Sequence, residues 1–375
     1  MRKLLLMLLA LVCMAGVACA SDNVAFMDVS VSPEATYVDL GDAVVTDFDG
    51  LEAFLDQLPL LEKFDMYATP MYAPECDRLA ARYPNVRFGW TLHFGDHVLR
   101  TDATAFSTLH NSASKAHTSE ELSIVRYCKD LLALDIGHNA VTDISFLYDM
   151  PQLKVLIIAC NKITDASPVA SLKNLEYLEV FKNKISDLTP FTGLDKLLDL
   201  NICFNYIKDW TPLHTMTHLE RLWMYCSNGY SEDHPVPKAI GNAVAAALPD
   251  THVDNRNYST NGGWREHYRY FIINEMFQTG VYIPFPTREE HAVEVAANEV
   301  AELRAKAEPL RAKADAAKAA LDDAIAAGNK HTKALENTFK KTEAAAAAAE
   351  EDVAEAEARL AEARAALEAS RADTP

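Results

Sequence analysis

The chain has 375 residues, with 54 acidic and 35 basic side chains and a formal net charge of −19 at pH 7. This acidity argues against nucleic acid or an anionic membrane as the partner, because both bind basic surfaces. It favours solubility and cationic partners, and part of it belongs to the solvated faces of C-terminal helices.

Residues 1–20 have the pattern of an export signal. An apolar run extends from Leu4 to Ala18, and Ala18-Cys19-Ala20 fits the small-x-small rule for cleavage. The run has about 15 residues, whereas a membrane-spanning helix needs about 20. We therefore expect a protein that is secreted, periplasmic or held at the cell surface, with no membrane insertion in its mature form. The alternative is a lipoprotein anchored at Cys19, although Gly16 stands where such signals usually carry leucine.

The cysteines do not form a disulfide framework, because an odd number remains after the signal is removed. They are Cys76, Cys128, Cys160, Cys203 and Cys226. Cys203 and Cys226 come from neighbouring repeats and could pair. We favour isolated thiols.

Residues 21–125 are predicted to form an α/β N-terminal cap. A terminal cap is needed because the first unit of a solenoid exposes apolar residues at its end. Residues 91–100 have a hairpin pattern with Gly95-Asp96 at the turn. The other predicted elements are helices at 51–58 and 75–83 and strands at 61–66 and 86–94.

A repeat of 22 residues occupies residues 126–228. Two leucines and a β-branched residue precede an asparagine, and an aliphatic residue and an aspartate follow it two and four positions later. A fifth unit starts at Leu219 and loses register at Ser227. This period predicts a leucine-rich-repeat solenoid, in which stacked units bury one continuous core. The repeated asparagines, predicted to form a structural ladder, are Asn139, Asn161, Asn183 and Asn205.

Each position of the repeat has a physical role. Strand side chains alternate, so the leucines point inward and the residues between them point outward. The asparagine lies where the chain turns inward, and its amide can donate to and accept from backbone groups that the turn leaves unpaired. Prolines recur on the return segment, where we expect 3₁₀ or extended backbone: Pro168, Pro190 and Pro212.

The pattern LxxLxLxxNxIxDIxxLxxL, over roughly residues 131–228, resembles the repeats of internalin-type bacterial surface proteins. This resemblance implies a curved scaffold that binds another macromolecule on its concave sheet, and it carries over no catalytic residue. The flanks at 21–125 and 229–286 resemble those of secreted repeat proteins of anaerobic bacteria, which implies no known activity.

The outward-facing strand positions form the predicted binding surface. Large exposed apolar patches mark binding sites, and Tyr, Trp and Arg dominate interface hot spots. The alternative is that the C-terminal helices or the aromatic flank fold over this patch and bury it. The predicted binding residues are Tyr177, Glu179, Phe181, Asp199, Phe204, Arg221, Trp223 and Tyr225.

Residues 229–286 are predicted to cap the C-terminal end of the repeats. We expect a helix at 238–248, one last strand at 251–253 and an aromatic helix within 262–277 that covers the last repeat. The residues expected on the covering face of this helix are Trp264, Tyr268, Phe271 and Ile272.

Residues 287–375 are rich in alanine, glutamate, lysine and arginine, so they are helical by propensity. Heptad spacing of apolar residues on either side of Gly328-Asn329 favours an antiparallel coiled-coil hairpin that bends at Gly328. Pro309 is expected to kink the first arm or to mark a helix start. One long helix that assembles with partner chains is the alternative.

The sequence lacks HExxH, GxSxG, phosphate-loop, paired CxxC and EF-hand motifs. Pro212 prevents the helix that a metal pair of His214 and His218 would need, and Cys160 beside His138 lacks an orienting acid. We therefore predict no catalytic residue, no metal and no cofactor.

The predicted fold class is α/β, a right-handed leucine-rich-repeat solenoid of short parallel strands with an α/β N-terminal cap and a C-terminal all-α coiled-coil hairpin. The predicted function is that of an exported, non-enzymatic recognition protein that binds a protein or a glycan on its concave face, with self-association through the coiled coil. The alternative is a structural envelope spacer or assembly protein that acts through its coiled-coil tail.

Overall fold

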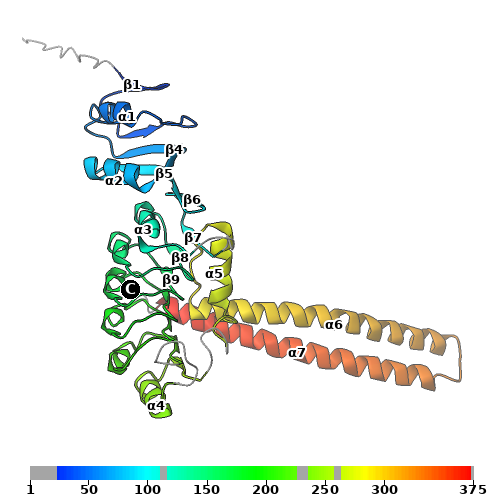
Figure 1. The fold of residues 1–375 in the computed structure, drawn as a ribbon. Helices are drawn as coiled ribbons and strands as arrows, with labels where there is room; N and C mark the ends of the chain where they lie inside the picture. The colour runs from blue at the N-terminus through cyan, green and yellow to red at the C-terminus, as the bar shows by residue number, and fades with distance from the viewer. Residues whose placement is uncertain (1–22, 110–115, 226–234, 257–262, 373–375) are drawn as a thin grey trace, which may run out of the picture. The chain divides into compact units, whose positions relative to one another are not determined.

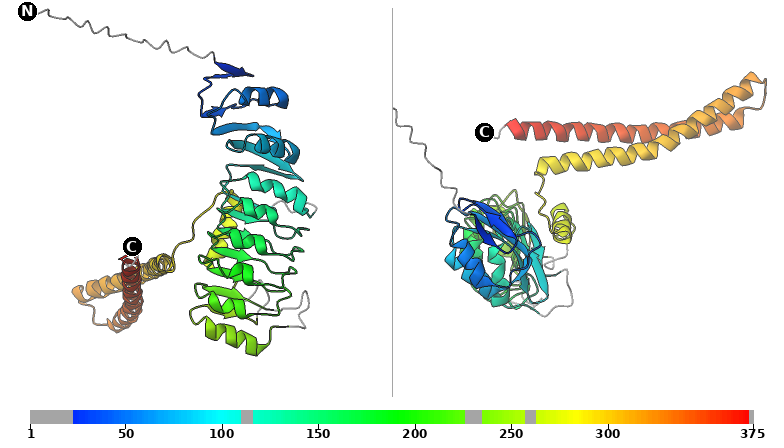
Figure 2. Two further views of the ribbon diagram at one scale, coloured as in Figure 1. Left: turned by 90° about the vertical axis from the view of Figure 1, so that its left-hand side faces the viewer. Right: turned by 90° about the horizontal axis from the view of Figure 1, so that it is seen from above.

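The computed structural model describes residues 23–109, 116–225, 235–256 and 263–372. It divides into two compact units, one ending at Ile283 and the other starting at Pro284 (Figures 1 and 2). Three predictions fall outside the described residues: the signal peptide, the pairing of Cys226 with Cys203 and the register break at Ser227.

The first unit begins with a small α/β region. Two short antiparallel strands precede a four-stranded sheet of order β3-β4-β5-β6, in which only β6 is antiparallel to its neighbour. The predicted helices and strands of this region are confirmed, with ends shifted by a few residues. The elements are β1 (Val24–Phe26), β2 (Val29–Val31), β3 (Tyr37–Asp39), α1 (Phe48–Leu55), β4 (Lys63–Met71), α2 (Ala73–Arg82), β5 (Arg87–Phe94) and β6 (His97–Arg100).

The predicted hairpin joins β5 to β6. Phe94 pairs with His97, and Gly95 has a φ of +56°, in the left-handed region that favours glycine. This turn places Asp96 and His97 at the start of β6, the edge strand that precedes the repeats in the sequence.

The repeats form a seven-stranded parallel sheet in the order β7 to β13 (Figure 2). Tyr177 pairs with Val155 on one side and Asp199 on the other, so neighbouring strands keep the period of the sequence. The predicted solenoid of short parallel strands is therefore confirmed. The strands are β7 (Ala105–Ser107), β8 (Ala133–Asp135), β9 (Val155–Ile157), β10 (Tyr177–Glu179), β11 (Asp199–Asn201), β12 (Arg221–Trp223) and β13 (His252–Asp254).

The return segments form 3₁₀ helices, as predicted, and the first of them is preceded by the short α-helix α3. The aspartate of each repeat explains where they start, because its carboxylate accepts a hydrogen bond from the backbone two residues on: Asp187 Oδ1 accepts from Thr189 N at 2.9 Å. The return elements are α3 (Ser119–Leu122), η1 (Ser123–Tyr127), η2 (Ser145–Asp149), η3 (Ser167–Ser171), η4 (Thr189–Phe191) and η5 (Thr211–Thr215).

The asparagines form the predicted ladder. Asn183 Nδ2 donates to the carbonyl of Val180 at 3.0 Å and to that of Ile158, in the preceding repeat, at 2.9 Å. Its Oδ1 accepts from Ile163 N at 3.0 Å. Each rung thus satisfies buried backbone groups of two repeats. The residues before the ladder asparagines adopt left-handed backbone with φ between 54° and 59°: His138, Cys160, Lys182 and Phe204.

The C-terminal part of this unit contains α4 (Lys238–Ala247), β13 and α5 (Tyr268–Thr279). The predicted helix and last strand are confirmed. The aromatic segment differs from its prediction, because Trp264 precedes the helix and Phe271 is 61% exposed. The buried face of α5 contains Arg269, Ile273, Met276 and Phe277.

The second unit is a helical hairpin of α6 (Arg288–Ala326) and α7 (Lys333–Ala372). Gly328 has a φ of +71° at the bend, and an ion pair between Glu290 and Arg371 at 3.1 Å joins the start of one helix to the end of the other. The predicted antiparallel hairpin is confirmed. Pro309 neither starts α6 nor ends it, because the helix continues through it. The small residues buried in the seam are Ala296, Ala307, Ala314, Ala346 and Ala356.

Candidate functional site

The predicted binding surface is covered in the structure. All three residues of each strand from β8 to β12 are buried, including those that point away from the leucine core. The expectation of an exposed patch is therefore wrong, and cover by the aromatic flank, the alternative considered for this surface, is observed. The predicted residues that are buried are Tyr177, Glu179, Phe181, Asp199, Phe204, Arg221 and Trp223, and Tyr225 is half-buried.

Trp264 fills the centre of this surface. Its ring lies 5.4 Å from that of Tyr177 and 5.3 Å from that of Trp223, and its side chain is fully buried. The Arg221 guanidinium lies over the indole at 4.6 Å, an arrangement that favours cation–π attraction. Residues of two strands thus form an aromatic slot for one side chain that is distant in the sequence.

A buried ion cluster lies beside the slot. Asp199 accepts from Arg221 Nη2 at 2.8 Å and from Arg269 Nη1 at 2.6 Å, and the Arg269 guanidinium also pairs with Glu220. Arg269 is only 1% exposed. Because buried charges need partners, the cluster ties the start of α5 to β11 and β12.

Glu179 is the acidic group beneath the indole. Its Oε2 accepts from Trp264 Nε1 at 3.3 Å and from Tyr177 OH at 3.1 Å. Burial raises the pKa of Glu179 to about 7, against the hydrogen bonds from Trp264 and Tyr177 and the charge of Arg265, which lower it. The carboxyl is therefore partly protonated near neutral pH.

The cover continues along α5 to the first strand of the sheet. The helix packs against β7 and β8 (Figure 1), and Ala105 N donates to Gly280 O at 3.2 Å. Beyond the helix, Tyr282 N donates to Thr104 Oγ1 at 2.8 Å. Residues 263–283 thus contact the sheet from β12 to β7.

The remaining predicted residues lie at the turn side of the surface. Phe204 and Tyr225 pack edge to face with ring centroids 5.9 Å apart. Cys160, considered with His138 for chemistry, has its thiol pKa raised to about 11 by burial, so it is a poor nucleophile at neutral pH.

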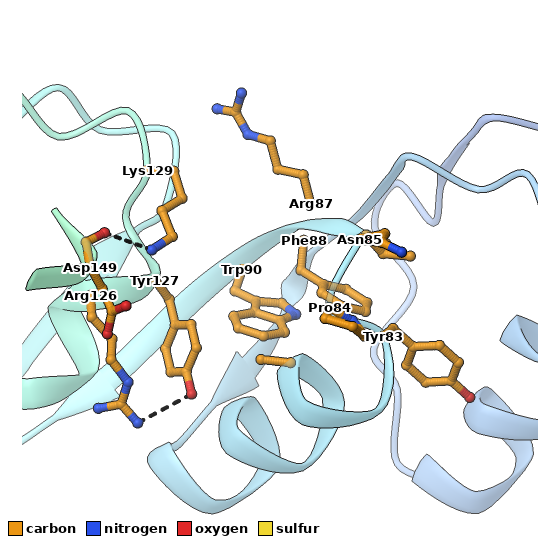
Figure 3. A pocket seen from close by; sticks show the side chains of 12 residues that line it. Tyr83, Pro84, Asn85, Arg87, Phe88, Trp90, Arg126, Tyr127, Lys129 and Asp149 are labelled. Atoms are coloured by element: carbon orange, nitrogen blue, oxygen red, sulfur yellow. Dashed lines mark hydrogen bonds between the residues drawn. The ribbon is translucent and has the colours of Figure 1, made fainter. Parts of the chain in front are cut away.

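A hollow of about 390 Å³ lies between the N-terminal sheet and the first repeat (Figure 3). Phe88 and Trp90 stack at 4.9 Å to form its floor, and Tyr127 meets Trp90 edge-on at 5.2 Å. Arg126 and Lys129 lie at the rim, where Lys129 Nζ donates to Asp149 O at 2.8 Å. An apolar floor with a basic rim suits an apolar side chain beside a carboxylate. The sequence did not indicate this hollow, because its two walls are distant along the chain.

Sequence reasoning also missed a group of potential metal ligands, Asp96, His97 and His117, whose ligand atoms all lie within 4.8 Å of one another. A hairpin turn supplies the first two residues and the segment before α3 supplies the third. No sequence motif of fixed spacing therefore contains all three. Along the described residues, no helix has the length and apolarity to cross a membrane.

Residues 151–193 match the family model described as "Leucine Rich repeats (2 copies)". A search of the curated proteins found no significant match.

Solved structures of repeat proteins are similar to the chain. Internalin C2 (inlC2) of Listeria monocytogenes is 22% identical over 60% of this chain and 84% of its own, with a TM-score of 0.31. The internalin inlF of the same organism is 20% identical over 60% and 85%, with a TM-score of 0.30. A leucine-rich-repeat protein of Leptospira interrogans is 21% identical over 54% and 50%, with a TM-score of 0.35.

The matched repeats, the strand register and the asparagine ladder define an α/β leucine-rich-repeat protein with a helical C-terminal hairpin. The predicted leucine-rich-repeat architecture is confirmed. Such repeats are typically protein-binding modules rather than enzymes.

Proposed function

We propose that this chain is an exported, non-enzymatic recognition protein whose repeats bind a protein partner on the concave face. The observation that carries the proposal is that this face already holds a polypeptide segment of the chain, with Trp264 in the aromatic slot and Arg269 on Asp199. A surface that accommodates these side chains within one molecule has the chemistry to bind them from another. The eight predicted binding residues are the proposed contacts.

The partner segment would displace residues 263–283 from the sheet. We infer that it carries an aromatic side chain for the slot between Tyr177 and Trp223 and a cationic side chain for Asp199. The net charge of −19 also favours a cationic partner. A glycan would stack on the same rings but would leave Asp199 without its second cation, which favours a protein.

A synthetic peptide tests whether the cover is exchangeable. The double variant Trp264→Ala, Arg269→Gln weakens the resident segment, and a fluorescent peptide of residues 263–283 is then added in trans. We expect the peptide to bind the double variant but not the wild-type protein, as measured by fluorescence anisotropy. Adding Trp223→Ala to the double variant should abolish this binding, because it removes one wall of the slot.

Two results would contradict the proposal. One is a double variant with native circular dichroism that does not bind the peptide. The other is binding that survives Trp223→Ala. Phe271→Ala is the matched control, because Phe271 lies on the same segment but is 61% exposed. A partner whose capture depends on Tyr127 and not on Trp223 would move the site to the hollow of Figure 3.

The runner-up function is a structural spacer or assembly unit. It is supported by the paired helices α6 and α7, which have 39 and 40 residues and would reach about 60 Å at 1.5 Å per residue. Deletion of residues 287–375 discriminates between the two functions. Recognition requires that the shortened protein still bind and change only its oligomeric state.

A further inference from the structure

We propose that Asp96, His97 and His117 form a binding site for a divalent transition-metal ion of the zinc type, which fastens the β5–β6 hairpin to the first repeat. This site lies away from the concave face, and the proposal does not depend on the proposed recognition function.

The two imidazoles are buried, and three of their four ring nitrogens lack a hydrogen-bond partner among the described residues. His97 is 2% exposed and His117 is 3% exposed. Both ring nitrogens of His97 and Nε2 of His117 have no hydrogen-bond partner within the described part of the chain. Buried polar groups are normally satisfied, so three such nitrogens in one place need an explanation. A bound metal ion supplies one for the nitrogens that face Asp96.

The ligand atoms have the separation that a metal ion requires. Nε2 of His97 lies 3.6 Å, and Nε2 of His117 lies 3.5 Å, from the same Oδ1 of Asp96. These distances are too long for good hydrogen bonds. Around a tetrahedral zinc ion with bonds of about 2.0–2.1 Å, neighbouring ligand atoms are about 3.3 Å apart. The ligand atoms of the three residues all lie within 4.8 Å of one another, so the two imidazoles need to approach each other to close on one ion.

The donor set selects the class of ion. Two imidazole nitrogens and one carboxylate oxygen suit zinc, cobalt, nickel or iron, whereas magnesium and calcium prefer oxygen ligands. Imidazole binds such ions through the unprotonated nitrogen of its neutral form. Asp96 is 47% exposed at its side chain, which leaves room for water at the remaining coordination position.

His117 is held in place by groups outside the site. Its backbone N donates to Oδ1 of Asn139, the first rung of the ladder, at 2.8 Å, and its carbonyl accepts from Ala140 N at 2.8 Å. Oε2 of Glu121 lies 3.7 Å from its Nδ1, which is beyond hydrogen-bond distance, so Glu121 places a negative charge near the ring without bonding to it. Glu121 is itself fixed by a capping box with Thr118.

The hairpin turn leaves space for this imidazole. A Cβ atom added to Gly95 would lie 2.2 Å from Cε1 of His117, so a larger residue would push the ring away. Phe106 stands edge-on to His97 at 5.5 Å, and Phe94 lies 5.6 Å from the same ring. These rings form an apolar wall that would keep the bound ion dry on one side.

The test uses the full-length protein freed of metal by dialysis against a chelator. Isothermal titration with Zn²⁺ should show one strong site, and Co²⁺ should give the intense visible absorption of tetrahedral coordination. Mg²⁺ should give neither signal. The side-chain ¹⁵N resonances of two histidines should shift on addition of Zn²⁺, a readout that needs no substitution.

Asp96→Asn is the diagnostic variant, because Asp96 lies at an exposed turn and its replacement preserves shape. We expect it to weaken Zn²⁺ binding by at least about tenfold, the scale of changes near metal sites. His214→Gln is the control and should leave the affinity unchanged. Wild-type protein that gives no Co²⁺ bands and no histidine shifts would overturn the proposal, as would Asp96→Asn that binds Zn²⁺ like the wild type, or loss of binding in the His214 control.

Discussion

The indole nitrogen of Trp264 donates a hydrogen bond to Oε2 of Glu179 over 3.3 Å, although 85 residues separate the two in the sequence. This contact joins the segment that covers the concave sheet to the middle strand of the repeats. Both side chains are buried, so the bond lies in a region of low dielectric where its loss is costly. The stability of the cover is therefore linked to the chemistry of one carboxyl group.

The first prediction is that the free energy of unfolding falls as the pH rises through the pKa of Glu179. Its pKa is about 7 in the folded protein, whereas a solvated glutamate, as in the unfolded chain, has a pKa of 4.5. Between these two pH values the folded state therefore binds more protons than the unfolded state. The free energy of unfolding should therefore decrease by roughly 3 kcal/mol between pH 4.5 and pH 8 through this group. Glu179→Gln should remove that part of the pH dependence, as measured by urea denaturation at pH 5 and pH 8.

Glu275→Gln is the matched control for this prediction. Glu275 is exposed on α5, so its replacement should leave the pH dependence of the wild-type protein intact. If Glu179→Gln and Glu275→Gln have the same slope as the wild type, Glu179 is not protonated in the folded protein near pH 7.

The second prediction concerns the packing of the cover. Trp264→Ala removes a fully buried indole from between Tyr177 and Trp223 and should lower the free energy of unfolding by about 3–5 kcal/mol. It should also raise binding of a hydrophobic dye, because the slot becomes accessible. Phe271→Ala, on the exposed side of the same segment, should change stability by no more than about 0.5 kcal/mol. Equal effects of the two substitutions would mean that residues 263–283 do not pack on the sheet as observed.

The repeats could be predicted from the sequence because each unit carries its own local chemistry. The asparagine, the leucines and the aspartate act within one unit or on its direct neighbour, and every interaction recurs at the same spacing. Asn183 bonds to Ile158 and Val180, and Asp187 starts the 3₁₀ helix two residues later. Such short-range rules leave a clear periodic signal.

The cover could not be predicted in the same way. Which segment fills the concave face depends on contacts across many repeats, and α5 lacks a clean amphipathic pattern. Helical spacing placed Phe271 on the buried face, but Arg269 occupies that face because Asp199 and Glu220 provide its partners. A buried arginine cannot be predicted when burial is assigned from hydrophobicity alone.

The histidine cluster escaped prediction for a related reason. His97 follows a hairpin turn and His117 precedes a helical cap, and only the docking of the N-terminal sheet on the first repeat brings them together. The sequence indicates Gly95 as a turn residue, yet the space it leaves for the His117 ring depends on the three-dimensional packing.

The third prediction is that the asparagine ladder is a main source of stability. Asn183→Ala removes three hydrogen bonds to buried backbone groups and should lower the free energy of unfolding by about 3 kcal/mol or more. Asn174→Ala is the comparison, because its amide donates to Pro151 O and accepts from Lys196 Nζ at the exposed surface, and its cost should stay below about 1 kcal/mol. Urea denaturation at fixed pH measures both. Similar values for the two variants would contradict the structural role of the ladder.

The fourth prediction concerns the helical hairpin. Ala346 is fully buried in the seam, between Glu343 and Glu350, which pair with Arg311 on the opposite helix at 3.0 and 2.6 Å. Ala346→Glu would place an unpaired charge in the seam and push the helices apart, since a buried charge without a partner is costly. Ala347→Glu makes the same chemical change one residue later, where the side chain is exposed.

With one nitroxide label on an exposed position of each arm, the interhelix distance distribution should broaden in Ala346→Glu and stay narrow in Ala347→Glu. The surface ion pairs cannot compensate, because exposed pairs each contribute no more than about 1 kcal/mol. Narrow distributions in both variants would show that small seam residues do not hold the arms together, and they would weaken the case for the hairpin as a rigid spacer.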